Sequence, residues 1–136
     1  YQSAELSKQM AMLINIAGRQ RMLTQRLVLL LCLSRSGVVS NDTRQDLFRT
    51  MNRFSISLNI LKRLTPKAMQ DERALPITQR LSSVQDDWVA LRALISTATR
   101  SGKGQHVSDI LNADEQAEKL LKRMNEIVLR YEEAAL

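Results

Sequence analysis

Apolar residues recur at alternating spacings of three and four in four separate stretches, and this pattern restricts the chain to packed helices. The second stretch is the most regular, with Leu47, Met51, Phe54, Leu58 and Leu61. Such spacing places the apolar side chains on one face of a helix. Only four Gly, two Pro and 4% aromatic residues are present. Both the spacing and the composition therefore predict an all-α domain.

The expected helix ends follow from capping and helix-breaking residues. Ser40 to Thr43 supply N-cap side chains. Gly37 stops the first helix, Pro66 ends the second or lies just beyond it, and Pro76 opens the third. The first helix is expected over about residues 3–35 and the fourth over about 107–131 or beyond, with Gly102 and Gly104 in the connection between the third and the fourth.

Short connections between four amphipathic helices predict an antiparallel up-down-up-down four-helix bundle with long first and fourth helices. We expect residues 1–136 to form one domain, with both chain ends at one end of the bundle. No stretch reaches the ~18 apolar residues that a membrane span needs. The layout suits a domain looped out between two membrane spans that are absent from this chain, and it equally suits any other helical bundle.

The residues that carry catalytic or metal chemistry are few and scattered. His106, the only histidine, falls in the expected loop, and no cluster has metal-ligand spacing. The acidic pairs at 86–87 and 114–115 are expected to be exposed, and Cys32 is expected to be a buried structural thiol within an apolar run. The sequence therefore predicts no enzyme, no metal and no cofactor.

The charge balance leaves two explanations open. Twenty Lys and Arg against fourteen Asp and Glu give a net charge of +6, which indicates an anionic partner or simply a dispersed solvated surface. The basic residues do not form runs, and aromatic residues for base stacking are scarce. Nucleic-acid binding is therefore not expected.

Arg21 interrupts the apolar pattern of the first helix. On a helical projection Arg21 points into the middle of a second stripe of small and mostly apolar residues. A guanidinium trapped between this stripe and a partner would need an anion. One face carries Leu13, Ile16, Leu23, Leu27 and Leu30, and the second stripe carries Met10, Ile14, Ala17, Gly18, Thr24, Gln25, Val28 and Cys32.

Gly18 lies one turn before Arg21 and suggests how two copies could meet. A glycine inside a helix costs roughly 1 kcal/mol relative to alanine, so it usually permits close approach of another backbone. Two copies packed across Ala17 and Gly18 would bring the two Arg21 side chains together around a small anion.

Other interpretations of these residues remain open. Arg21 could reach solvent or pair with Glu115 or Glu118 of the last helix, and Arg19 and Arg26 could form structural ion pairs. Met10, Met12 and Met22 are expected to pack in the core.

Residues 15–27, Asn-Ile-Ala-Gly-Arg-Gln-Arg-Met-Leu-Thr-Gln-Arg-Leu, resemble the signature of PilJ-type sensor domains. These are the N-terminal ligand-binding regions of type IV pili methyl-accepting chemotaxis transducers. The run is similar, more loosely, to the P-box of NarX-type nitrate/nitrite sensor kinases. It departs from that P-box at Arg19 and Gln20, and Thr24 stands where Ser is common in the PilJ type.

The resemblance implies a periplasmic four-helix bundle between two spans of an inner-membrane receptor. It implies a homodimer joined through the first helices, with nitrate or nitrite held at the interface by Arg21 of both subunits. The implied ligand-binding set is Arg21, Gly18, Ala17, Asn15, Met22 and Gln25. The competing hypothesis is a ligand-free bundle that docks a partner protein through the first helix.

Overall fold

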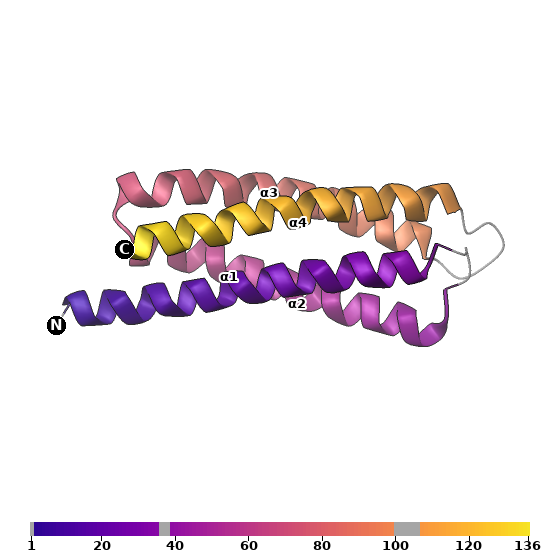
Figure 1. The fold of residues 1–136 in the computed structure, drawn as a ribbon, viewed down its shortest axis with the longest axis horizontal. Coiled ribbons are helices and arrows are strands. Elements are labelled where there is room, and N and C mark those ends of the chain that lie inside the picture. The colour runs from indigo at the N-terminus through magenta and orange to yellow at the C-terminus, as the bar shows by residue number, and fades with distance from the viewer. Residues whose placement is uncertain (1, 36–38, 100–106) are drawn as a thin grey trace.

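The computed structural model describes residues 2–35, 39–99 and 107–136 (Figure 1). It contains four helices, and the predicted four-helix bundle is confirmed. They are α1 (Gln2–Leu33), α2 (Asn41–Ala68), α3 (Asp71–Ala98) and α4 (Val107–Ala135). In the described part of the chain, no helix is sufficiently long and apolar to span a bilayer.

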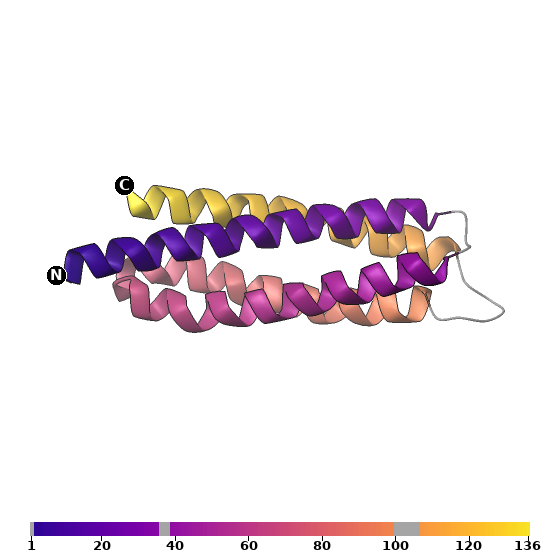
Figure 2. The same ribbon diagram turned by 90° about the horizontal axis from the view of Figure 1, so that it is seen from below.

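The helices form a square in which sequence order sets the neighbours. α1 packs against α2 and α4, and α3 packs against the same two helices. Figures 1 and 2 show both chain ends and the α2–α3 turn at one end of the bundle. α1 and α4 therefore leave the domain on the same side, as predicted.

The core follows the three-and-four spacing on every helix, and its largest side chains meet between α2 and α3. The ring centroids of Phe54 and Trp88 lie 4.3 Å apart, and Trp88 Nε1 donates a hydrogen bond to Ser55 Oγ at 2.9 Å. On α4, Leu120 and Ile127 are fully buried, whereas Leu121 is only half-buried.

The helix ends are partly as predicted. Ser40 caps α2 by accepting a hydrogen bond from the Thr43 backbone N–H at 3.1 Å. The predicted boundaries at Pro66 and Pro76 are wrong, because both prolines lie inside helices. Ala68 after Pro66 and Ala74 before Pro76 are buried, so tertiary packing extends both helices past their prolines. Gly37, Gly102, Gly104 and His106 lie outside the described residues.

A buried hydrogen bond crosses the bundle near the chain ends. The hydroxyls of Thr65 on α2 and Tyr131 on α4 lie 2.6 Å apart. Burial raises the pKa of Tyr131 to about 12, although the bond to Thr65 acts in the opposite direction. The phenol therefore stays protonated in the folded state and links two helices that are diagonal in the square.

An ion pair at the opposite end corrects one prediction. Asp114 is 2% exposed and accepts a hydrogen bond from Arg35 Nε at 3.0 Å, so the predicted exposure of this carboxylate is wrong. The hydrogen bond to Asp114 raises the pKa of Arg35. The carboxylate is buried because it shares the α4 face of Ala117, and the arginine that follows α1 supplies its counter-charge.

The prediction for Cys32 is also wrong, because its side chain is exposed. Its neighbour Leu31 takes the core position with no exposed surface. An apolar run of this length contains residues from every side of a helix, so membership of the run does not determine burial.

Candidate functional site on the first helix

The inward face of α1 differs from the predicted stripe. Ala17 and Thr24 have no exposed surface, whereas Ile16 and Leu23 are only half-buried. The predicted assignment of these four residues to faces is therefore wrong. The inward seam is Leu13, Ala17, Gln20, Thr24, Leu27, Leu31 and Ser34.

Gln20 is a buried polar residue of the motif, which was predicted only to be a departure from the NarX-type P-box. Its Nε2 donates a hydrogen bond to the carbonyl of Phe54 on α2 at 3.1 Å, while Thr24 Oγ1 donates to the Gln20 carbonyl at 2.7 Å. The bond from Gln20 fixes the register between α1 and α2. Its position could have been found from the spacing, since Gln20 continues the series that begins at Leu13 and Ala17.

One row along the outward face of α1 carries no charged residue, although Arg19 and Arg26 are exposed beside it. Met22, Leu29 and Leu33 are 64%, 54% and 63% exposed, so the expected core packing of Met22 is wrong, as it is for Met12 at 44%. A single exposed apolar residue is ordinary, but an uncharged row along the solvent side of a helix is typical of an interface. The row is Ala11, Asn15, Gly18, Met22, Gln25, Leu29 and Leu33.

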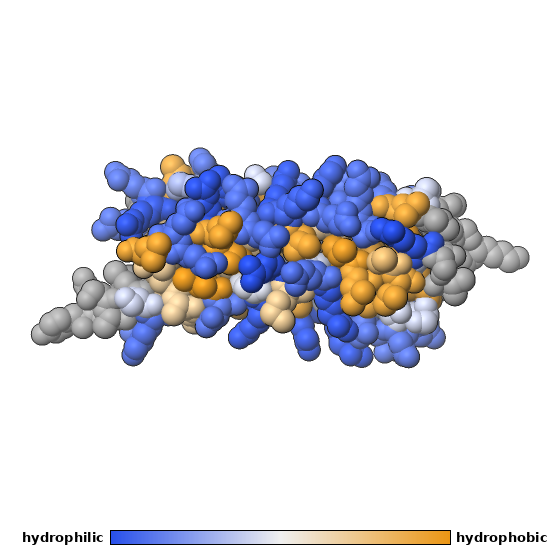
Figure 3. Space-filling view, viewed as in Figure 1, coloured by the Kyte–Doolittle hydropathy of each residue, from blue (hydrophilic) through white to orange (hydrophobic). Residues whose placement is uncertain are grey.

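Figure 3 shows this side of the molecule, with apolar patches following the line where α1 and α4 meet and hydrophilic side chains around them. A groove of about 460 Å³ lies between the two helices. Four of the six predicted ligand-binding residues line it, whereas Ala17 is buried in the core and Gln25 is exposed outside the groove. The lining is Ile14, Asn15, Gly18, Arg19, Arg21, Met22, Val128 and Glu132.

Gly18 has no packing role within its own subunit. A Cβ atom built on Gly18 would meet no atom within 4 Å. The helix therefore bears the cost of a glycine without using the space it provides. Any close approach that this glycine permits would therefore be made by a helix outside this chain.

Arg21 stands half-buried at the edge of the groove. Within the described residues it forms no ion pair at 4.0 Å or less, although Glu132 lines the same groove. Glu115, one of the expected partners, instead lies 3.9 Å from Lys119. The expected ion pair of Arg26 is present, with Asp46 at 3.4 Å.

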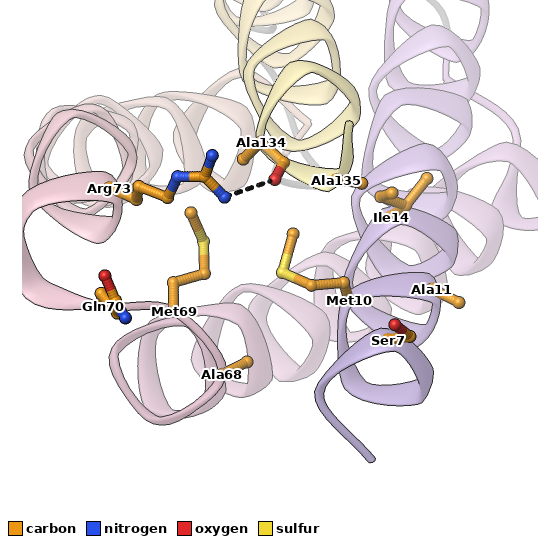
Figure 4. Close-up of a pocket in the computed structure, with 10 residues that line it drawn as sticks. All are labelled: Ser7, Met10, Ala11, Ile14, Ala68, Met69, Gln70, Arg73, Ala134 and Ala135. Carbon is orange, nitrogen blue, oxygen red and sulfur yellow. Dashed lines mark hydrogen bonds between the residues drawn. The ribbon is translucent and has the colours of Figure 1, made fainter. Parts of the chain in front are cut away.

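A second hollow of about 420 Å³ opens at the end of the bundle that holds the chain ends. Figure 4 shows Met10 and Met69 facing each other across it, and Arg73 donating a hydrogen bond to the carbonyl of Ala134 at 3.3 Å. None of the predicted ligand-binding residues lines this hollow. Its one guanidinium is engaged with the end of α4, so the groove beside Arg21 is the better candidate for a ligand site.

Comparison with known proteins places this architecture in a family. No curated protein and no solved structure matches the chain. The sequence profile described as the type IV pili methyl-accepting chemotaxis transducer N-terminal region, PilJ, matches residues 4–117. This match covers α1, α2, α3 and the first part of α4, and therefore includes the whole of the Arg21 motif. The chain belongs to the PilJ family of chemotaxis-transducer sensor domains.

Proposed function

We propose that this sensor domain binds a small oxyanion, nitrate or nitrite foremost, between the α1 helices of two copies. The observation that carries the proposal is the uncharged outward row of α1 with Arg21 on its α4 side. Gly18, without a packing role in its own subunit, would let the two backbones approach. Asn15 and Met22 complete the part of the groove that faces the second copy.

In such a dimer, the charge of Arg21 would make the association of the two copies depend on ligand binding. Two Arg21 guanidinium groups ~6 Å apart at an effective dielectric constant of ~20 repel each other by about 3 kcal/mol. A monovalent anion between them replaces this repulsion with attraction. The planar guanidinium forks also match the geometry of a planar oxyanion. Ligand binding and dimer formation should therefore strengthen each other.

The position of the groove suggests how binding is converted into a signal. Its lining comes from α1 and α4, which are the two helices that leave the domain at the same end. An anion that draws Arg21 toward the second copy would shift α1 relative to α4, which is a differential contact between two arrangements. In a periplasmic domain between two membrane spans, this shift would be passed to the spans.

Titration calorimetry with nitrate on the wild type, Arg21→Ala and Arg63→Ala tests the proposal. Arg63 is an exposed arginine on α2, away from the groove. A charge-assisted contact contributes about 1.5–3 kcal/mol, so Arg21→Ala should lose at least about tenfold in affinity, and Arg63→Ala should not. Sedimentation should show more dimer with nitrate. Equal affinity of the wild type and Arg21→Ala would remove Arg21 from the site.

A partner protein is the second candidate occupant of this face. The exposure of Met22, Leu29 and Leu33 favours it, because apolar side chains contribute more to a protein interface than to an oxyanion site. This alternative predicts that nitrate, nitrite, sulfate and simple carboxylates all leave the melting temperature unchanged. It also predicts that Met22→Lys abolishes binding of the partner while the domain stays folded.

A further inference from the structure

The basic residues of the domain are concentrated on one side. α1 and α2 together carry ten Lys and Arg against three Asp and Glu, whereas α3 and α4 carry seven against eleven. The net charge of +6 is therefore unevenly distributed, and the half formed by α1 and α2 is strongly basic. The groove between α1 and α2 lies within this half, and it shares Arg19 and Met22 with the groove beside Arg21.

This second groove has a volume of about 520 Å³ and is lined by three arginines. Arg19 and Arg26 come from α1, one heptad apart, and Arg53 comes from α2. Met22 and Leu23 supply its apolar surface, and Ser57 adds a hydroxyl group. No carboxylate is among the lining residues.

The register of the two helices holds two of these arginines opposite each other. The buried bond from Gln20 to the Phe54 carbonyl joins the immediate neighbours of Arg19 and Arg53. Phe54 is itself fixed by its packing against Trp88. This hydrogen bond lies in the core, so it holds the backbones of α1 and α2 beneath the groove in place. Only the arginine side chains must then change conformation when a ligand binds.

The nearest carboxylate does not neutralise the groove. Asp46 lies 3.4 Å from Arg26 and 3.5 Å from Arg49, so one acid serves two arginines. Arg19 and Arg53 form no ion pair within the part of the chain that the structure describes. Two uncompensated guanidinium groups and a third that shares its partner thus face one small groove.

We propose that the α1–α2 groove binds a small organic polyanion, a di- or tricarboxylate, with Arg19 and Arg53 as the principal contacts. Guanidinium forks bind carboxylates in bidentate fashion, and Met22 and Leu23 accept the carbon skeleton between the acid groups. Nitrate carries one charge and no carbon skeleton, so it suits this groove poorly. The site shares Arg19 and Met22 with the groove beside Arg21, but Arg53 lines the α1–α2 groove alone.

Citrate and acetate, titrated by calorimetry at equal ionic strength, provide the test. Citrate should bind at least tenfold more tightly than acetate. Arg53→Gln should weaken citrate binding at least tenfold, while Arg63→Gln, which removes the same charge from the same helix, should change it less than twofold. Both arginines are exposed, so both variants should fold, and circular dichroism checks this.

Three outcomes would overturn the proposal. Equal losses in Arg53→Gln and Arg63→Gln would show that citrate responds only to net charge. Equal affinity for citrate and acetate would remove the polyanion selectivity. Loss of citrate binding in Arg21→Ala, with retention in Arg53→Gln, would place citrate in the other groove. Nitrate binding should persist in Arg53→Gln, so the two proposals can fail independently.

The source of the carboxylate selectivity can be separated in the same experiment. Inorganic phosphate carries multiple charge without a carbon skeleton, so it should bind more weakly than citrate if Met22 and Leu23 contribute. Amide shifts of a ¹⁵N-labelled domain should change around Leu23 and Ser57 on citrate addition and stay constant around Asn15. Shifts confined to Asn15 and its neighbours would contradict the assigned groove.

Discussion

The two flanks of α4 are built differently. On the α3 side, Arg80 Nε lies 3.1 Å from Glu126 Oε1, and Arg123 pairs with Asp87. On the α1 side, the described residues hold one cross-helix ion pair, Arg35 with Asp114, at the end remote from the chain termini. Nearer the chain ends, that flank contains Arg21 and Glu132 in one groove without an ion pair between them.

The difference is between arginines that are held in ion pairs and an arginine that can contact a ligand. An exposed ion pair contributes only about 0.2–1 kcal/mol to stability, so the α3 flank gains little from its two pairs. Its arginines are nevertheless occupied and would have to exchange a carboxylate for any ligand. Within the described residues Arg21 has no such partner to exchange, and for this reason our proposal places the anion on the α1 flank.

The largest expected effect concerns Tyr131, whose hydrogen bond to Thr65 holds the end of α4 near the groove on the α1 flank. Its pKa is raised from 10.0 to about 12 by burial, so between these values the folded state keeps a proton that the unfolded state has lost. Stability is therefore retained below pH 10 and falls as the pH rises toward 12, by about 2 kcal/mol. Denaturant unfolding of the wild type and Tyr131→Phe at pH 9, 10, 11 and 12 measures this. The phenylalanine variant should lack this part of the loss, and parallel curves would show that the phenol is not buried.

The substitution Gly18→Ala tests whether the α1 flank is less stable than it could be because its glycine serves binding. A Cβ at this position meets no atom within 4 Å, and alanine is favoured over glycine in a helix by about 1 kcal/mol. The isolated subunit should therefore become more stable by about 1 kcal/mol in denaturant unfolding. Dimerisation and nitrate affinity should fall, since the methyl group occupies the space between two helices. A less stable Gly18→Ala subunit would show that the glycine serves its own fold.

Glu132 provides a smaller test of the same flank. Its carboxylate shares the groove with Arg21 and repels an entering anion. At roughly 8 Å and a dielectric constant of about 60 this repulsion is about 0.7 kcal/mol, so Glu132→Gln should bind nitrate about threefold more tightly in calorimetry. Glu133→Gln is the matched control, because Glu133 lies 3.7 Å from Arg130 and does not line the groove. Equal changes in both variants would reduce the effect to net charge.

The fold and the position of the motif could be predicted from the sequence because both depend on local spacing. Leu47, Met51, Phe54, Leu58 and Leu61 are all buried as the spacing requires. The predictions failed where one pattern admits two outcomes. Pro76 can open a helix or lie inside its early turns, and the burial of Ala74 determines which occurs.

The candidate site could be predicted only in part because a helical projection does not show where the neighbouring helices lie. Helical spacing placed Gly18 beside Arg21, whereas Asn15 and Met22 came only from the family resemblance, and the structure brings all four into one groove. Glu132 is far away in sequence and enters that groove only through the packing of α4 on α1. Arg53 reaches the second groove in the same way, through a register fixed by a buried bond.

The smallest expected effect concerns the ion pairs on the α3 flank of α4. Arg123→Ala removes the pair with Asp87, whose side chains are 49% and 43% exposed, so the unfolding free energy should fall by only about 0.5 kcal/mol. Nitrate affinity should be unchanged, because Arg123 lies on the α3 side of α4 and lines neither groove beside α1. Chemical denaturation and nitrate calorimetry on this one variant measure both quantities. A nitrate defect as large as that of Arg21→Ala would mean that the two flanks of α4 are not independent, and that the anion acts through the whole helix.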